Sequence, residues 1–219
     1  MNEKLTELVM ILDRSGSMRG LEPDTIGGYN SMIEKQKTEE GDVFVSTVLF
    51  DNFSEVIHDR VPIDRIEPLT ENEYFVRGCT ALLDAVGGAI RHIRTVHRYA
   101  REEDRPAKTI FVITTDGMEN ASRRYSYADV KKLVEQQKES AGWEFIFLGA
   151  DIDAISVAGR FGIGADRAVK YRKDRRGLEL NYRVLSDTVA EMRKGRTVTD
   201  GWKAEIEEYE KGEGGSQNH

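Results

Sequence analysis

The feature that most constrains the fold is a pair of apolar runs that each end directly at an aspartate. The run LVMIL, residues 8–12, is followed by Asp13, and the run IFVITT, residues 110–115, is followed by Asp116. Continuous runs of this kind are typical of central strands in a parallel sheet, which is covered by helices on both faces. The pattern therefore predicts an α/β fold with both aspartates at the carboxyl ends of buried strands.

Strands and helices alternate along the rest of the chain. Apolar and β-branched runs predict strands at residues 7–12, 42–50, 56–63, 108–115, 143–150 and 167–172. Helical spacing of apolar residues predicts helices at residues 25–38, 78–96, 127–140, 154–163 and 177–195. The short link DNFSE makes the second and third strands an antiparallel hairpin. The predicted fold class is α/β, with a doubly wound, mostly parallel sheet.

The composition divides the chain into three parts. Residues 1–175 hold the alternating strands and helices and are expected to form one globular domain. Residues 176–195 are expected to form a C-terminal helix that packs on or extends the domain through Leu185, Val189 and Met192. Residues 196–219 are acidic and contain several glycines, so we expect a partly disordered tail.

Charge and composition argue against several classes of protein. The net charge of −7 opposes binding to nucleic acid, which favours basic surfaces. No apolar run approaches the ~20 residues that span a bilayer, so no membrane association is expected. The N-terminus lacks the features of a signal peptide, and the single cysteine, Cys79, precludes an internal disulfide. A cytoplasmic location is therefore expected, while the sequence leaves the oligomeric state open.

Five oxygen-bearing side chains are candidates for a metal site. Asp13, Ser15 and Ser17 occupy the segment DRSGSM, Thr80 occupies GCTALLDA, and Asp116 follows the later strand. Ligands of open α/β sheets bind in the crevice at the carboxyl ends of the strands, where strand order reverses. Oxygen ligands alone favour a hard cation, Mg²⁺ or Mn²⁺, with Ca²⁺ as a further candidate. The set contains no histidine or lysine, so it offers no obvious general base.

The three segments DRSGSM, GCTALLDA and TTDG also carry a resemblance. In this order and context they resemble the metal-ion-dependent adhesion site of von Willebrand factor type A (VWA) domains, and the chain is most similar to the bacterial or phage stand-alone type. The resemblance covers roughly residues 7–172. It implies a Rossmann-like sheet with one antiparallel edge strand, which agrees with the predicted hairpin.

The resemblance also implies a function and a role for each site residue. Ser15, Ser17 and Thr80 would coordinate Mg²⁺ directly or nearly so, whereas Asp13 and Asp116 would often act through water. In this family an acidic side chain of a protein partner commonly completes the ion. The implied function is a metal-dependent protein-binding module rather than an enzyme.

Two alternatives remain open at this point. Asp13 and the serines could form only a turn and a helix N-cap, because Asp and Ser are favoured there in any protein. A metal-dependent hydrolase or phosphotransferase could instead use Asp13 as its nucleophile. Such an enzyme typically has a second acid two residues later, where this chain has Ser15, and a lysine to hold the phosphoryl group. No lysine lies close to Asp116 in the sequence.

Three further residues near these motifs have expected roles. Arg14 lies between the metal-site residues and is a candidate partner-binding residue, or else an outward-pointing spacer. Asp84 is expected to support its loop rather than to touch the ion. Asp151 follows a predicted strand and is a candidate for a peripheral contact only.

Overall fold

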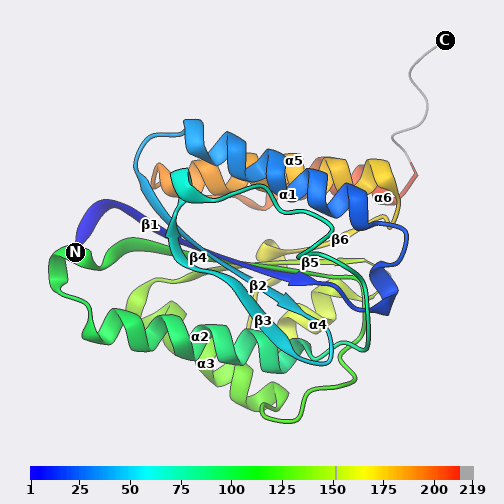
Figure 1. The fold of residues 1–219 in the computed structure, drawn as a ribbon, viewed down its shortest axis with the longest axis horizontal. Helices are drawn as coiled ribbons and strands as arrows, with labels where there is room; N and C mark the ends of the chain where they lie inside the picture. The colour runs from blue at the N-terminus through cyan, green and yellow to red at the C-terminus, as the bar shows by residue number, and fades with distance from the viewer. Residues whose placement is uncertain (151, 213–219) are drawn as a thin grey trace.

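A six-stranded sheet forms the centre of the computed structural model, which describes residues 1–150 and 152–212 (Figure 1). The strands are β1 Asn2–Asp13, β2 Asp42–Phe50, β3 Ser54–Pro62, β4 Pro106–Thr115, β5 Glu144–Ala150 and β6 Ala168–Tyr171. Their order in the sheet is β3-β2-β1-β4-β5-β6. All neighbours pair in parallel except β2 and β3, which are antiparallel. The predicted fold class and its one antiparallel edge strand are confirmed.

Helices cover both faces of the sheet (Figure 1). One layer holds α1 Glu22–Thr38, α5 Arg175–Arg193 and α6 Ala204–Glu210; the other holds α2 Leu82–Tyr99, α3 Tyr127–Ala141 and α4 Ala154–Arg160. Short 3₁₀ helices lie at Gly16–Met18, Ile63–Arg65, Glu102–Asp104, Ala165–Arg167 and Asp200–Lys203. None of the helices in the described ranges is both long enough and apolar enough to cross a bilayer.

The apolar run in β1 is continuous because both of its faces are buried. Leu8, Met10 and Leu12 pack in the core on the α1 and α5 side. Val9 and Ile11 alternate with them and pack in the core on the α2 and α3 side. Every second side chain of a strand points to the same face, so a strand between two helical layers has no polar face.

Strand order reverses at β1. The chain leaves β1 through α1 and reaches β2 on one side, and it later returns through α2 to β4 on the other side. The carboxyl ends of β1 and β4 therefore flank the point where ligands bind in open α/β sheets. Asp13 ends β1 and Asp116 directly follows β4, as the sequence predicted.

Several element boundaries differ from the predictions. β1 begins at Asn2 rather than at residue 7, because the polar residues before Leu8 pair with both neighbouring strands. α1 begins at Glu22, with Pro23 in its first turn, where the missing N–H of proline costs no helical hydrogen bond. α2 begins only at Leu82, since residues 78–81 form a loop.

The C-terminal segment that was expected to be partly disordered, residues 196–219, contains the short helix α6. Ile206 is only 1% exposed, and it packs in the core on the α5 side. Lys203 is also buried, and its Nζ donates hydrogen bonds to the carbonyls of Ala165 and Ala168. The acidic composition of this segment did not predict α6, because one apolar side chain per turn is enough for a short helix to pack against the core. Residues 213–219 lie outside the described part of the chain.

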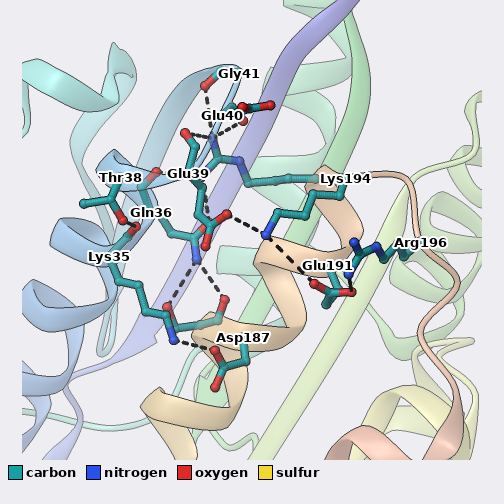
Figure 2. A network of polar contacts seen from close by, with 12 residues as sticks. Lys35, Gln36, Thr38, Glu39, Glu40, Gly41, Asp187, Glu191, Lys194 and Arg196 are labelled. Atoms are coloured by element: carbon teal, nitrogen blue, oxygen red, sulfur yellow. Dashed lines mark hydrogen bonds and ion pairs between the residues drawn. The ribbon is translucent and has the colours of Figure 1, made fainter.

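A polar network joins the C-terminus of α1 to α5 (Figure 2). Buried Arg193 of α5 donates through Nη1 to the carbonyl and side-chain oxygens of Gln36, at 2.7 and 2.9 Å. Its Nη2 donates to the carbonyls of Glu40 and Gly41, at 3.1 and 3.0 Å. Lys194 forms an ion pair with Glu39 at 2.7 Å. α5 is therefore an integral part of the fold rather than an appendage.

The glycine pair in α1 provides a test of how closely α1 and α5 pack. An ideal Cβ on Gly28 would lie 2.2 Å from Cδ2 of Tyr182 in α5, whereas a Cβ on exposed Gly27 would meet no atom within 4 Å. We expect Gly28→Ala to lower the free energy of unfolding by about 1–3 kcal/mol through overpacking. Gly27→Ala should raise it by up to about 1 kcal/mol through helix propensity. Urea unfolding of both variants would measure this, and equal effects would contradict the close contact.

Candidate metal centre

Asp13 is fully enclosed at the end of β1. Its side chain is 1% exposed, and each carboxylate oxygen accepts a hydrogen bond. Oδ1 accepts from the backbone N–H of Ser15 at 2.7 Å, and Oδ2 accepts from the hydroxyl of Thr115 at 2.7 Å. Burial raises the pKa of Asp13 above its usual range, and the nearby charge of Asp116 raises it further. The hydrogen bonds have the opposite effect and lower this pKa. The ionised form of Asp13 is therefore costly in this buried position.

Three hydroxyl groups gather beside this carboxylate. Ser15 Oγ and Ser17 Oγ lie 2.7 Å apart. A Cβ on Gly117 would lie 2.8 Å from Thr80 Oγ1 and 3.0 Å from Ser17 Oγ. Because Gly117 has no side chain, a space remains beside these hydroxyl groups that any larger residue would fill. Gly117 also allows the segment of Thr80 to lie against the loop of the two serines.

Thr80 is positioned by the loop that follows β4. Its backbone N–H donates to Asn120 Oδ1 at 2.9 Å, and the N–H of Asn120 donates to the carbonyl of Thr80 at 3.0 Å. Glu119 accepts from the N–H of Leu83 at 2.8 Å, which holds the start of α2 on the same loop. Sequence reasoning missed Asn120 and Glu119, although their place directly after TTDG was a usable signal.

Asp84 supports a loop, although it lies in α2 and the loop is not the one expected from the sequence. Its carboxylate accepts hydrogen bonds from the backbone N–H groups of Arg123, Arg124 and Tyr125, at 2.9 to 3.0 Å. All three belong to the segment between β4 and α3. Asp151, the other aspartate considered from the sequence, lies outside the described residues.

Asp116 is the least satisfied group of the site. It is 3% exposed, and neither of its carboxylate oxygens accepts a hydrogen bond from the residues that the structure describes. Lys173 Nζ lies 2.8 Å from Oδ2, an ion pair whose angles are not those of a hydrogen bond. Buried carboxylate oxygens without donors are costly, and they are the groups that a cation would satisfy.

The five predicted residues fit a divalent cation with oxygen ligands. Asp13, Ser15, Ser17, Thr80 and Asp116 come together at the carboxyl ends of β1 and β4, and their side chains offer oxygen alone. In the described ranges no three or more His, Cys, Asp or Glu side chains group as a metal site. Hydroxyl and carboxylate oxygens suit a hard cation such as Mg²⁺ more than a soft metal.

Arg14 does not point outward, although both interpretations from the sequence expected it to. Its side chain is 1% exposed and turns into the loops around the site. Nε donates to Asp51 at 2.9 Å and Nη2 donates to Glu55 at 2.7 Å. Arg77 also pairs with Asp51, at 2.8 Å. A buried guanidinium needs charged partners, so Arg14 ties together the loops after β1 and β2 instead of facing solvent.

The structure also changes one argument about the hydrolase alternative. No lysine is near Asp116 in the sequence, yet the segment after β6 brings Lys173 to it. Asp13, however, is enclosed and both of its oxygens accept hydrogen bonds, so neither is presented to a substrate. The geometry gives no specific support to Asp13 as a nucleophile.

The similarity of the chain to known proteins is confined to three-dimensional structure. No family model matches the chain, and no curated protein is detectably similar in sequence. A von Willebrand factor type A protein from Catenulispora acidiphila aligns with 85% of this chain and 43% of its own, at a TM-score of 0.54 and 14% identity. The ArnB paralog VWA2 from Sulfolobus acidocaldarius aligns with 87% of this chain and 45% of its own, at a TM-score of 0.50 and 18% identity.

A third similar structure has a metal in its site. It is proximal thread matrix protein 1 from the mussel byssus, described as having a zinc-occupied MIDAS motif, the metal-ion-dependent adhesion site. It aligns with 84% of this chain and 46% of its own, at a TM-score of 0.57 and 13% identity. This chain spans less than half the length of these three structures. At such low identity the likeness concerns the fold, and the chain has the Rossmann-like VWA fold with a C-terminal helix.

Proposed function

We propose that this chain is a Mg²⁺-dependent protein-binding module whose ion is completed by an Asp or Glu side chain of a protein partner. The observation that carries the proposal is the pair of buried, unsatisfied oxygens of Asp116 beside the hydroxyl cluster of Ser15, Ser17 and Thr80. Two carboxylates nearly neutralise a divalent ion, and hydroxyls add ligands without adding charge. The zinc-occupied motif of the mussel protein supports a divalent ion in this fold.

Exposed apolar side chains around the site support a protein partner. Phe53 is 76% exposed in the turn after β2, and Met118 is 71% exposed directly after Gly117. Phe75 is exposed in the loop before Thr80. Exposed apolar side chains in the loops at the carboxyl ends of the strands can contribute to an interaction surface. A partner that presents an acidic residue flanked by apolar side chains would use both features.

The proposal assigns no catalytic step to the chain. The five site residues include no histidine, and Asp13 is enclosed, so none of them is placed to exchange protons with a substrate. Cys79 is an exposed free thiol, which supports a reducing compartment such as the cytoplasm.

Acetate is a minimal probe for the carboxylate of a partner. We expect protein loaded with Mn²⁺ to speed the transverse relaxation of acetate methyl protons in a saturable manner, with a Kd of about 1–10 mM, typical of a single ion contact. Neutral acetamide at the same concentration is the control. The relaxation should be measured by NMR with protein in excess over Mn²⁺. Bound Mn²⁺ that relaxes acetate no more than acetamide would contradict the proposed role of an acidic partner.

A further inference from the structure

We propose that Lys173 is a built-in counter-ion of the metal centre, which pairs with Asp116 when the divalent cation is absent and must leave it when the cation binds. This inference rests on the proposed metal centre and goes beyond it. It assigns to one lysine of this chain the control of how tightly the ion is held.

Lys173 forms an ion pair with Asp116, whose carboxylate oxygens accept no hydrogen bond from the described residues. Lys173 Nζ lies 2.8 Å from Asp116 Oδ2, and the side chain of Asp116 is 0% exposed. An ammonium group is a compact point charge, so Lys173 can neutralise the buried carboxylate of Asp116 without a metal.

The ammonium group of Lys173 and a metal ion cannot both lie beside Asp116. Lys173 supplies charge but no ligand oxygen, so it neutralises Asp116 without engaging the hydroxyls of Ser15, Ser17 and Thr80. A divalent ion beside Asp116 repels an ammonium group within a few ångströms, more strongly in a buried site than in water. Binding of the ion must therefore displace the ammonium group, and that displacement weakens the affinity of the site.

The backbone around Lys173 allows its side chain to move alone. The next residue, Asp174, caps α5 by accepting from the N–H of Gly177 at 2.7 Å, and it also accepts from the hydroxyl of Tyr209 in α6. Arg172 pairs with Asp174 at 2.6 Å. The segment is held by its neighbours, while the side chain of Lys173 is 26% exposed and has a path to solvent.

Replacement of Lys173 should have two opposite effects. Lys173→Met should bind Mn²⁺ about tenfold more tightly than the native chain, because the competing charge is removed. The same variant without metal should melt about 5–10 °C lower, because Asp116 then lacks its counter-ion. A lysine with a structural role only would lower the melting temperature without raising the metal affinity.

Two further variants serve as matched controls. Lys170→Met makes the same change three residues earlier, within β6, where the lysine pairs with Glu210 at 2.7 Å, so its Mn²⁺ affinity should stay native. Lys173→Arg keeps the charge and should also keep the native affinity. It shows whether a changed affinity in Lys173→Met comes from the lost charge or from misfolding. Affinities should be measured by electron paramagnetic resonance of Mn²⁺, with circular dichroism for the melting temperatures.

The outcomes separate this inference from the proposed function. Tighter binding by Lys173→Met than by Lys170→Met, or saturable binding by Lys173→Met alone, supports the counter-ion. Native or weaker affinity in Lys173→Met overturns it but leaves the metal centre intact. Absence of saturable binding in every variant overturns both the counter-ion and the metal centre.

Discussion

Asp13→Asn is expected to lower the affinity for Mn²⁺ about a hundredfold while the fold persists. Loss of an oriented carboxylate typically costs ten- to a hundredfold in metal affinity, even where it acts through water. The amide fits the native contacts, because its oxygen can accept from the N–H of Ser15 and its NH₂ can donate to Thr115 Oγ1. The hydroxyl of Thr115 can then donate to the carbonyl of Gly117, 3.2 Å away.

The same substitution should not destabilise the metal-free protein. Burial raises the pKa of Asp13, which means that the ionised carboxyl opposes folding at neutral pH. A neutral amide removes that cost, so the melting temperature without metal should be equal to or above the native value. Mn²⁺ binding should be followed by electron paramagnetic resonance and unfolding by circular dichroism.

Asp59→Asn is the matched control for Asp13→Asn. Asp59 lies on the edge strand β3, where its carboxylate is exposed and pairs with His92 at 2.8 Å. This variant has the same change of charge and should bind Mn²⁺ with native affinity. Equal affinity in the Asp13 and Asp59 variants would show that the ion binds elsewhere, and the proposed centre would be wrong.

The sequence was sufficient to predict the sheet and the hydroxyl cluster. Strands with both faces buried have a distinctive apolar run, and β1 and β4 are of this kind. The position of a ligand site at their carboxyl ends follows from the reversal of strand order at β1. The residues Asp13, Ser15 and Ser17 are local neighbours, so their spacing alone predicts that their oxygens converge.

The misses share a physical cause, which is that they depend on contacts distant in sequence. Arg14 was expected to face a partner or to point outward as a spacer, because spacing does not reveal its ion pairs with Asp51 and Glu55. Lys173 was overlooked because the segment after β6 reaches Asp116 only through the fold. α6 was overlooked because its composition is acidic, although Ile206 anchors it. Local patterns predict elements well, whereas the partners of charged groups require the tertiary structure.

The network at the end of α1 carries the second large effect. The last carbonyls of a helix have no hydrogen-bond partner within the helix. Here the guanidinium of Arg193 donates to the carbonyls of Gln36, Glu39 and the two residues that follow. Arg193 is 7% exposed. The backbone carbonyl of Arg193 accepts a hydrogen bond from Lys108 Nζ. These contacts connect α1, α5 and β4 around a single side chain.

Arg193→Met is therefore expected to lower the free energy of unfolding by about 3–5 kcal/mol, because the buried carbonyls lose a charged donor that water cannot replace. The melting temperature should fall by at least about 6 °C. Arg196→Met is the control, since Arg196 is 66% exposed and pairs with Glu191 on the surface. It should change stability by less than about 0.5 kcal/mol. Similar losses in both variants, measured by urea unfolding, would mean that surface charge rather than the buried network stabilises the junction. Because the network lies at the opposite end of α1 from Ser17, Arg193→Met should retain native Mn²⁺ affinity wherever it remains folded.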